Sequence, residues 1–324
     1  MLIALPTLRA RSVGIGCLIS CLGLTDAALP AKTRRGEPAV TACEGARPTP
    51  PSALFFQLRS GAFPGGDHPD VAVHLPPGFD ATRSPGAVLY FHGWNGCVAA
   101  ALSDDDVPCE DGGEPRAASA LASQLDEARV NAMLVAVELR IDAATGETGE
   151  LAGPGTMRAI LGEVLGERLP TWLGCALEVD ALERIVVVAH SGGYQAAASV
   201  LEFGDLPRIG EVVLLDAFYG ADEVFGRWLD DALSGEAPSR RFVDLYTCCG
   251  GTLARSRAMG EIARTRAWGE ELVRNDDDDR GGELDSRDLD RAITFKRVGA
   301  PHGALPRRYM RAVLESSGFS AIGH

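Results

Sequence analysis

The chain has 324 residues, of which 46% are hydrophobic, and this is enough for one large domain with a continuous core. This composition excludes a chain that is disordered throughout and a small module held together mainly by disulfides. The formal net charge is −14, so the chain lacks the general basic character by which nucleic-acid-binding proteins displace counterions. We therefore expect no nucleic-acid partner, although the net charge does not exclude a local basic patch.

Residues 1–31 are predicted to be an export signal, because Arg9 and Arg11 precede an uncharged stretch that is too short to span a bilayer. The Leu-Ile-Ser-Cys sequence that ends at Cys21 resembles a lipobox, in which the cysteine is lipidated. Residues 25–27 could instead be cleaved by an ordinary signal peptidase, and a buried N-terminal helix is a further alternative. We expect a secreted or periplasmic protein, with membrane attachment only if Cys21 is lipidated.

The cysteine count supports this compartment. Six of the eight cysteines remain once the export signal is removed, an even number that fits disulfides formed in an oxidising environment. Cys97 with Cys109 is the most local candidate pair, whereas the adjacent Cys248 and Cys249 are expected to bond elsewhere. Buried free thiols are the alternative. The six are Cys43, Cys97, Cys109, Cys175, Cys248 and Cys249.

A proline-rich segment, residues 32–52, is predicted to link the signal to a domain formed by residues 53–324. Eight β-rich runs recur in this domain, and several are almost continuously apolar, which is typical of strands covered by helices on both faces. Helical patterns at residues 117–129 and 156–169 lie between them. We predict an α/β fold with a mostly parallel, eight-stranded sheet. The runs are residues 54–58, 70–75, 87–91, 133–139, 184–189, 211–215, 242–246 and 293–298.

The most informative segment is residues 185–198, in which a buried strand is followed by His-Ser-Gly-Gly and then by a helix of small residues. It resembles the G-x-S-x-G nucleophile elbow of the α/β-hydrolase superfamily, with Ala189 in the first glycine position. A serine at such a sharp turn is held in a strained backbone conformation, so its neighbours must be small. Ser191 is the predicted nucleophile, and a serine N-cap followed by turn glycines is the alternative.

Two further segments strengthen this resemblance. The strand at residues 87–91 ends in His-Gly-Trp, which is similar to the oxyanion loop of the superfamily. The resemblance implies that the backbone N–H groups of Trp94 and Gly192 form the oxyanion hole and that His92 is structural. Residues 74–79 are similar to the entry segment of secreted serine esterases and polyester-depolymerase-like members, without naming a substrate.

The resemblance places the catalytic base after the last strand, and of the six histidines only His302 stands there, in the segment Gly-Ala-Pro-His-Gly. The resemblance restricts the position of the catalytic acid less closely. Asp216 directly follows the strand at residues 211–215, a position that some α/β-hydrolases use, and no carboxylate directly follows the next strand. The order Ser191, Asp216, His302 is then that of the superfamily. Asp222, Glu223 and Asp244 are alternatives for the acid.

Four long segments that follow strands are expected to cover the site, since substrates bind at the carboxyl ends of parallel strands. Phe218 and Tyr219, together with Phe225 and Trp228, are expected to form an apolar substrate wall, unless they pack in the core. The segment from Asn275 to Asp290, which contains the Asp276–Asp279 run, is predicted to be a solvated loop. A calcium site is the alternative, although the acidic residues lack the ligand spacing of an EF-hand. The four segments are residues 96–116, 141–155, 217–240 and 250–291.

The resemblance implies a carboxylesterase-like serine hydrolase that cleaves a small-molecule or polymeric ester through an acyl-enzyme, with no metal or organic cofactor. A peptidase or amidase with the same triad is the nearest rival. An inactive α/β-hydrolase-fold binding protein is a second alternative. Redox chemistry at Cys248 and Cys249 is a third, although no Cys-x-x-Cys motif supports it.

Overall fold

The computed structural model describes residues 52–141, 147–233, 240–266, 273–276 and 281–323. Contacts divide the chain into residues 1–39 and residues 40–324, and every described residue belongs to the second unit. The predicted export signal and all but the last residue of the predicted linker lie outside the described residues.

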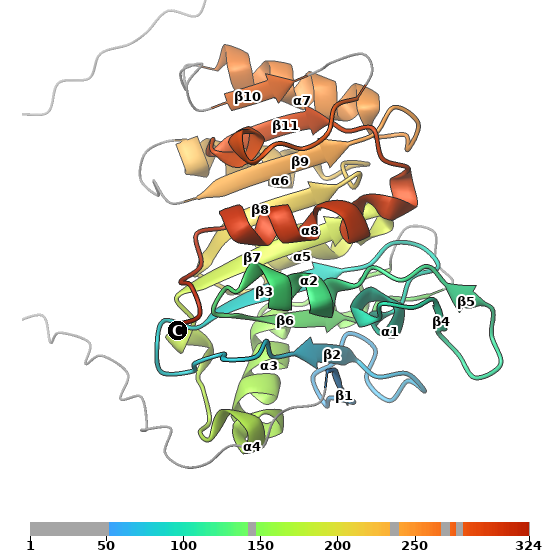
Figure 1. The fold of residues 1–324 in the computed structure, drawn as a ribbon, viewed down its shortest axis with the longest axis vertical. Helices are drawn as coiled ribbons and strands as arrows, with labels where there is room; N and C mark the ends of the chain where they lie inside the picture. Colours follow the sequence, from blue (N-terminus) through green and yellow to red (C-terminus); the bar gives the residue numbers. More distant parts are fainter. Residues whose placement is uncertain (1–51, 142–146, 234–239, 267–272, 277–280, 324) are drawn as a thin grey trace, which may run out of the picture. The chain divides into compact units, whose positions relative to one another are not determined.

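The second unit is built around one sheet of nine strands in the order β1-β2-β6-β3-β7-β8-β9-β11-β10 (Figure 1). The β1–β2 and β2–β6 pairs are antiparallel, and all other pairs are parallel. This mostly parallel sheet, with a serine turn after its central strand, confirms the predicted α/β-hydrolase fold. The strands are β1 (Leu54–Phe56), β2 (Val71–His74), β3 (Gly86–Phe91), β6 (Ala132–Val137), β7 (Arg184–His190), β8 (Ile209–Leu215), β9 (Arg241–Tyr246), β10 (Val273–Asp276) and β11 (Ile293–Arg297).

All eight predicted strands are present, and β10 is the addition. Its sequence, Val-Arg-Asn-Asp, carries no apolar pattern, and it pairs only with β11 at the edge of the sheet. A polar edge strand of four residues gives no signal that distinguishes it from a loop. The acidic segment beyond it was predicted to be a solvated loop; a capped 3₁₀ turn at Ser286–Leu289 occupies part of it.

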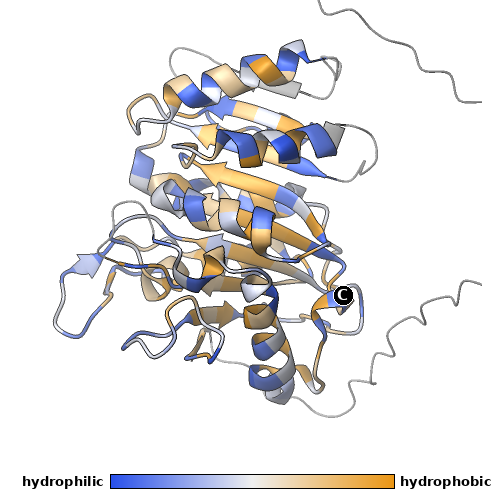
Figure 2. Ribbon diagram, turned by 180° about the vertical axis from the view of Figure 1, so that it is seen from behind, coloured by the Kyte–Doolittle hydropathy of each residue, from blue (hydrophilic) through white to orange (hydrophobic). Residues whose placement is uncertain are grey.

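Helices cover both faces of the sheet because the inner strands are apolar on both sides. Along β3, Leu89 and Phe91 pack into one hydrophobic cluster while Val88 and Tyr90 pack into the other. The first cluster contains α3, α5, α6 and α7, and the second contains α1, α2 and α8. Figure 2 shows hydrophobic strands between helices striped with hydrophilic residues. The helices are α1 (Val98–Leu102), α2 (Leu121–Ala128), α3 (Thr156–Glu163), α4 (Pro170–Leu173), α5 (Tyr194–Phe203), α6 (Asp222–Leu233), α7 (Leu253–Thr265) and α8 (Leu305–Ser316).

Disulfides hold two of the loops at the carboxyl end of the sheet. Cys97 and Cys109 are bonded, as predicted, with their Cα atoms 5.8 Å apart. Cys248 and Cys249 are bonded to each other, so the expectation that each bonds elsewhere was wrong; two neighbouring cysteines close an eight-membered ring without moving the rest of the loop. Cys175 is also disulfide-bonded. No helix in the described ranges is long and apolar enough to cross a membrane.

Candidate active site

The order of the strands opens a crevice between β3 and β7. The connection that leaves β3 runs through α1 and α2 over one face of the sheet, whereas the connection that leaves β7 runs through α5 over the other. Such a switch point leaves a gap at the carboxyl ends of the two strands. Phe91 and Ala189 are paired at these ends, so the loop after β3 and the turn after β7 begin side by side.

The turn after β7 holds Ser191 in a conformation that few residues other than glycine adopt. Its φ is +51°, in the left-handed region. Tight packing enforces this turn, because a Cβ at Gly193 would lie 2.8 Å from the carbonyl oxygen of His92, and a Cβ at Gly93 would lie 2.6 Å from Cβ of Ser191. The two glycines therefore let the β3 loop approach the serine, whereas the fully buried Ala189 at the first motif position fits without glycine.

The structure brings together the three residues predicted as nucleophile, base and acid. Nε2 of His302 lies 2.9 Å from Oγ of Ser191, and Nδ1 of His302 lies 2.7 Å from Oδ2 of Asp216. They come from the turn after β7, the loop after β11 and the end of β8. With Asp216 as acceptor, Nδ1 of His302 carries the proton and Nε2 is left to accept the hydrogen of the Ser191 hydroxyl.

Asp216 is fully buried, and donors surround its carboxylate. Oδ2 accepts from the hydroxyl of Thr247 at 2.6 Å, and Oδ1 accepts from the backbone N–H of Thr247 at 3.2 Å and from the hydroxyl of Thr252. Burial opposes the charged form, but the hydrogen bonds from His302, Thr247 and Thr252 outweigh it and hold the pKa of Asp216 below its usual value. The carboxylate is therefore ionised at neutral pH.

Thr247 and Thr252 were not identified from the sequence. They flank the Cys-Cys-Gly-Gly segment after β9, in which no residue is a carboxylate. Gly250 in this segment is required by the same contact, because a Cβ there would collide with the carboxylate of Asp216. A pair of hydroxyl residues around a glycine turn, one strand beyond the acid, is the signal that could have found them.

The other acid candidates lie elsewhere. Asp222 and Glu223 are in the first turn of α6, where Asp222 is ion-paired with Arg255. Asp244 is fully buried inside β9. Burial raises the pKa of Asp244 to about 8; the Ser256 hydroxyl counteracts this and the charge of Asp216 adds to it. Asp244 is therefore a neutral acid at pH 7.

The loop after β3 runs beside Ser191, where the predicted oxyanion donors lie. Gly192 occupies the first turn after the strand, where backbone N–H groups have no partner within the helix. Trp94 directly follows Gly93, and its N–H makes no hydrogen bond to any of the residues that the structure describes. Its side chain is 57% exposed. Neither N–H is used in a hydrogen bond between described backbone groups, so both stay available as donors, as the predicted oxyanion hole requires.

His92 fixes this loop together with Glu138, a residue that was not identified from the sequence. Its Nδ1 lies 2.9 Å from the carbonyl oxygen of Gly93, and its Nε2 lies 2.6 Å from Oε1 of Glu138. Glu138 also accepts from the backbone N–H of Val98, at the start of α1, at 3.1 Å. Burial favours neutral His92, but Glu138 outweighs it and raises the pKa of His92. The contacts of His92 and Glu138 therefore tie both ends of the loop to the residue that follows β6.

His190 supports the loop that carries His302. Its Nε2 donates to the carbonyl oxygen of His302 at 3.1 Å, and the two ring centroids are 5.0 Å apart. Burial, reinforced by the neighbouring His302, lowers the pKa of His190 to about 4. A neutral imidazole therefore lies next to the candidate base and adds no charge that would compete with its protonation.

Only one of the four residues predicted as an apolar wall faces the site. Phe218 is fully buried and packs edge-to-face on Phe225 of α6, and Trp228 of α6 belongs to the same core cluster, so these three side chains pack between α6 and the sheet instead. The reason is position, since side chains after the end of β8 alternate in direction. Tyr219 lies edge-on to His302, with ring centroids 6.4 Å apart, and its hydroxyl interacts with Ser191 and donates to the carbonyl oxygen of Gly250.

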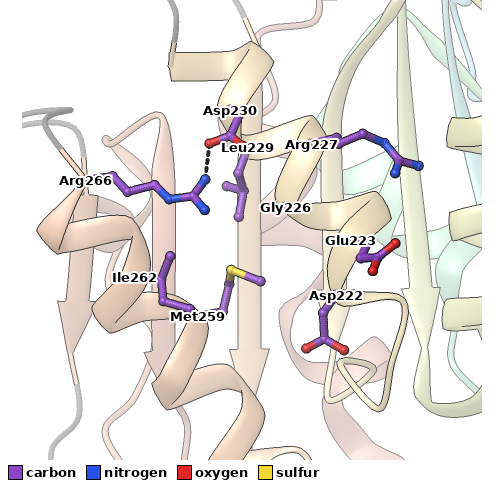
Figure 3. A pocket seen from close by; sticks show the side chains of 9 residues that line it. All are labelled: Asp222, Glu223, Gly226, Arg227, Leu229, Asp230, Met259, Ile262 and Arg266. Atoms are coloured by element: carbon purple, nitrogen blue, oxygen red, sulfur yellow. Dashed lines mark hydrogen bonds and ion pairs between the residues drawn. The ribbon is translucent and has the colours of Figure 1, made fainter. Parts of the chain in front are cut away.

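The surface carries several hollows. One of about 310 Å³ lies against the β3 loop and includes His190 and Gly303, the neighbours of Ser191 and His302. A groove of about 390 Å³ lies between α6 and α7, and Figure 3 shows Arg266 ion-paired with Asp230 across it. None of its lining residues belongs to the serine site. No cluster of metal ligands occurs among the described residues, and residues 277–280 of the acidic run lie outside them.

Comparison with known protein families finds no match, and no curated protein sequence matches the chain. Solved structures resemble it at low identity. The feruloyl esterase module of Clostridium thermocellum, complexed with sinapinate, is 14% identical over 76% of this chain and 82% of that chain, with a TM-score of 0.45. A ferulic acid esterase from Anaeromyces mucronatus is 14% identical over 82% and 90%, with a TM-score of 0.39. The siderophore hydrolase EstB from Aspergillus nidulans is 11% identical over 85% and 99%, with a TM-score of 0.38. At such identities, function has to be argued from the residues of this chain.

Proposed function

We propose that the protein is a serine hydrolase that cleaves ester bonds, with Ser191 as nucleophile, His302 as base and Asp216 as acid. The observation that carries this proposal is the unbroken chain of hydrogen bonds from Asp216 through His302 to Ser191, with the serine held on a strained turn. Structural serines rarely need a strained backbone, a buried carboxylate and an intervening imidazole at once.

The mechanism follows from the positions of these atoms. Nε2 of His302 removes the hydroxyl proton as Oγ of Ser191 attacks the ester carbonyl, and Asp216 stabilises the imidazolium that forms. The N–H groups of Trp94 and Gly192 stabilise the oxyanion. His302 then protonates the departing alcohol, and a water molecule activated by the same imidazole releases the acid. These steps require neither a metal ion nor an organic cofactor.

An ester is proposed in preference to an amide because an alcohol is a better leaving group than an amine, so the same triad cleaves an ester more readily. A peptidase or amidase with the same triad is the second candidate. The disulfides at Cys97–Cys109 and Cys248–Cys249 are typical of oxidising compartments. We therefore also propose that the protein acts outside the cytoplasm, after removal of residues 1–31.

The decisive experiment is labelling of the purified protein with a fluorophosphonate probe, which reacts covalently with activated serines. We expect labelling of the wild-type protein and none of Ser191→Ala. Ser123→Ala, on α2, is the matched control and should label normally. A panel of matched ester and amide substrates then separates an esterase from a peptidase. If the wild type and Ser191→Ala label equally, or if neither labels, the chain is not a serine hydrolase and the binding-protein alternative is favoured.

A further inference from the structure

The hollow beside the β3 loop is placed to receive part of a substrate. Its wall includes the backbone of residues 93–96, where the proposed oxyanion donor Trp94 lies, and the residues next to Ser191 and His302. A group joined to an ester at Ser191 by a few bonds would enter this space. At about 310 Å³, the hollow is large enough for a small polar substituent.

The charge in this hollow has one sign. None of its fifteen lining residues is acidic, and the one that is always charged is Arg116. The two lining histidines do not alter this: His190 is neutral, and His92 is neutralised by Glu138, which does not line the hollow.

Among the residues that the structure describes, Arg116 is without a polar partner. Its side chain makes no hydrogen bond or ion pair with any residue that the structure describes, whereas Arg158, for example, is bound to Asp180 by both of its terminal nitrogens. Arg116 is half-buried, and its guanidinium can form charge-assisted hydrogen bonds with an anion that enters the hollow.

The position of Arg116 is fixed by its surroundings. It lies on β5 (Pro115–Arg116), which pairs with β4 (Val107–Pro108) so that Val107 faces Arg116. The Cys97–Cys109 disulfide joins this hairpin to the end of the β3 loop, and Oδ1 of Asp106 accepts from the backbone N–H of Ala118 at 2.9 Å. The hairpin is thus held at both ends, which limits the entropy lost when a ligand binds.

The neighbouring hollow carries the opposite charge. It shares Ala117 and Gly303 with the first, and its charged lining residues are three acids and one base, so negative charge predominates: Asp104, Asp105, Asp106 and Arg307. An anion is attracted at one side of these shared residues and repelled at the other, so its position is defined.

We infer that the protein, acting as the esterase proposed above, prefers esters that carry a carboxylate close to the scissile bond, and that Arg116 binds this carboxylate. The carboxylate can belong to the acid half of the ester, as in a half-ester of a dicarboxylic acid, or to the alcohol half, as in an ester of a hydroxy acid. Both place the same anion a few bonds from the carbonyl carbon.

Two matched substrate pairs test the inference and distinguish the two halves. Mono-4-nitrophenyl glutarate against 4-nitrophenyl valerate varies the acid half, and 4-acetoxybenzoate against 4-acetoxybenzamide varies the alcohol half. We expect the wild type to favour the anion in at least one pair by about tenfold in kcat/KM, the effect typical of a charged hydrogen bond. Arg116→Gln should abolish this preference while leaving the neutral substrate unchanged, and Arg116→Lys should retain part of it.

Arg208→Gln is the control, because Arg208 is exposed just before β8, at the amino end of the strand. This variant should not change kcat/KM for either member of a pair. The inference is overturned if neither pair shows a preference for the anion, if Arg116→Gln keeps the preference, or if it slows both members of a pair equally. Fluorophosphonate labelling distinguishes failure of this inference from failure of the proposed function. Normal labelling without a preference for the anion overturns this inference alone. Loss of Ser191-dependent labelling overturns the proposed function as well.

Discussion

Two carboxyl groups on neighbouring strands, Asp216 and Asp244, are both fully buried, yet their chemistry is opposite. Asp244 lies within β9, opposite Leu214 of β8, where the backbone of the sheet leaves it few donors. Asp216 lies just beyond the last residue of β8, where the chain has left the sheet and side chains from two loops reach it. The comparison shows that burial alone does not set the charge of a carboxyl group; the donors available at the end of a strand decide it.

The largest difference is expected in catalysis. Asp216→Asn should lower kcat by roughly a thousandfold or more, because an amide neither stabilises the imidazolium of His302 nor fixes its tautomer. Asp244→Asn should change kcat by less than about threefold, since an amide resembles the neutral acid that it replaces. Steady-state rates on one activated ester check both. Comparable losses in the two variants would mean that the acid has been assigned to the wrong strand.

A smaller effect is expected from the donors that keep Asp216 ionised. Thr252→Val removes one hydroxyl and retains the shape of the side chain, and a hydrogen bond to a charged group contributes roughly 1.5–3 kcal/mol. We expect kcat to fall by about tenfold. Thr265→Val, at the exposed end of α7, is the matched control. Equal rates for Thr252→Val and the wild type would show that His302 alone keeps the carboxylate ionised.

The difference in charge between Asp216 and Asp244 also predicts how the stability of the fold depends on pH. Because the pKa of Asp244 is raised to about 8, the folded chain retains a proton that the unfolded chain releases near pH 4. The contribution of Asp244 to the free energy of unfolding therefore falls as pH rises from about 4 to about 8. Above about pH 8 this contribution is constant.

Asn at position 244 does not titrate, so the Tm of Asp244→Asn relative to the wild type should rise by several degrees across this range. Thermal unfolding of both proteins at matched pH values measures the difference. A difference that does not change with pH would show that Asp244 is ionised in the folded protein.

The smallest effect is expected at the Cys248–Cys249 disulfide. It lies between the two threonines that hold Asp216, but neither cysteine is among the described donors to the carboxylate. The double variant C248S/C249S should loosen the segment and lower kcat by less than about threefold. Rates on the same ester measure this. A loss as large as that of Thr252→Val would assign the disulfide a direct part in holding Asp216.

The sequence predicted most of the fold because hydrophobic patterning is strong in strands buried on both faces. It missed β10, whose residues are polar, and it assigned too much of the chain after β9 to a loop. At the site, Ser191, His302 and Asp216 could be named because each follows a recognisable strand. Thr252 and Glu138 could not, since their roles depend on contacts between segments distant in sequence. Phe218 and Tyr219 are adjacent and aromatic, and no pattern in the sequence indicates which of them turns inward.

The hairpin that carries Arg116 has a consequence for how such proteins diversify. It lies between α1 and α2, is joined to the start of α1 by Cys97–Cys109, and contributes no residue to the hydrogen-bonded chain at Ser191. Residues 110–114, between the two paired strands, can therefore vary in length and composition while the nucleophile, base and acid keep their positions. Exchange of this one hairpin would be a modular route by which the same catalytic apparatus acquires a new selectivity, in nature or by design.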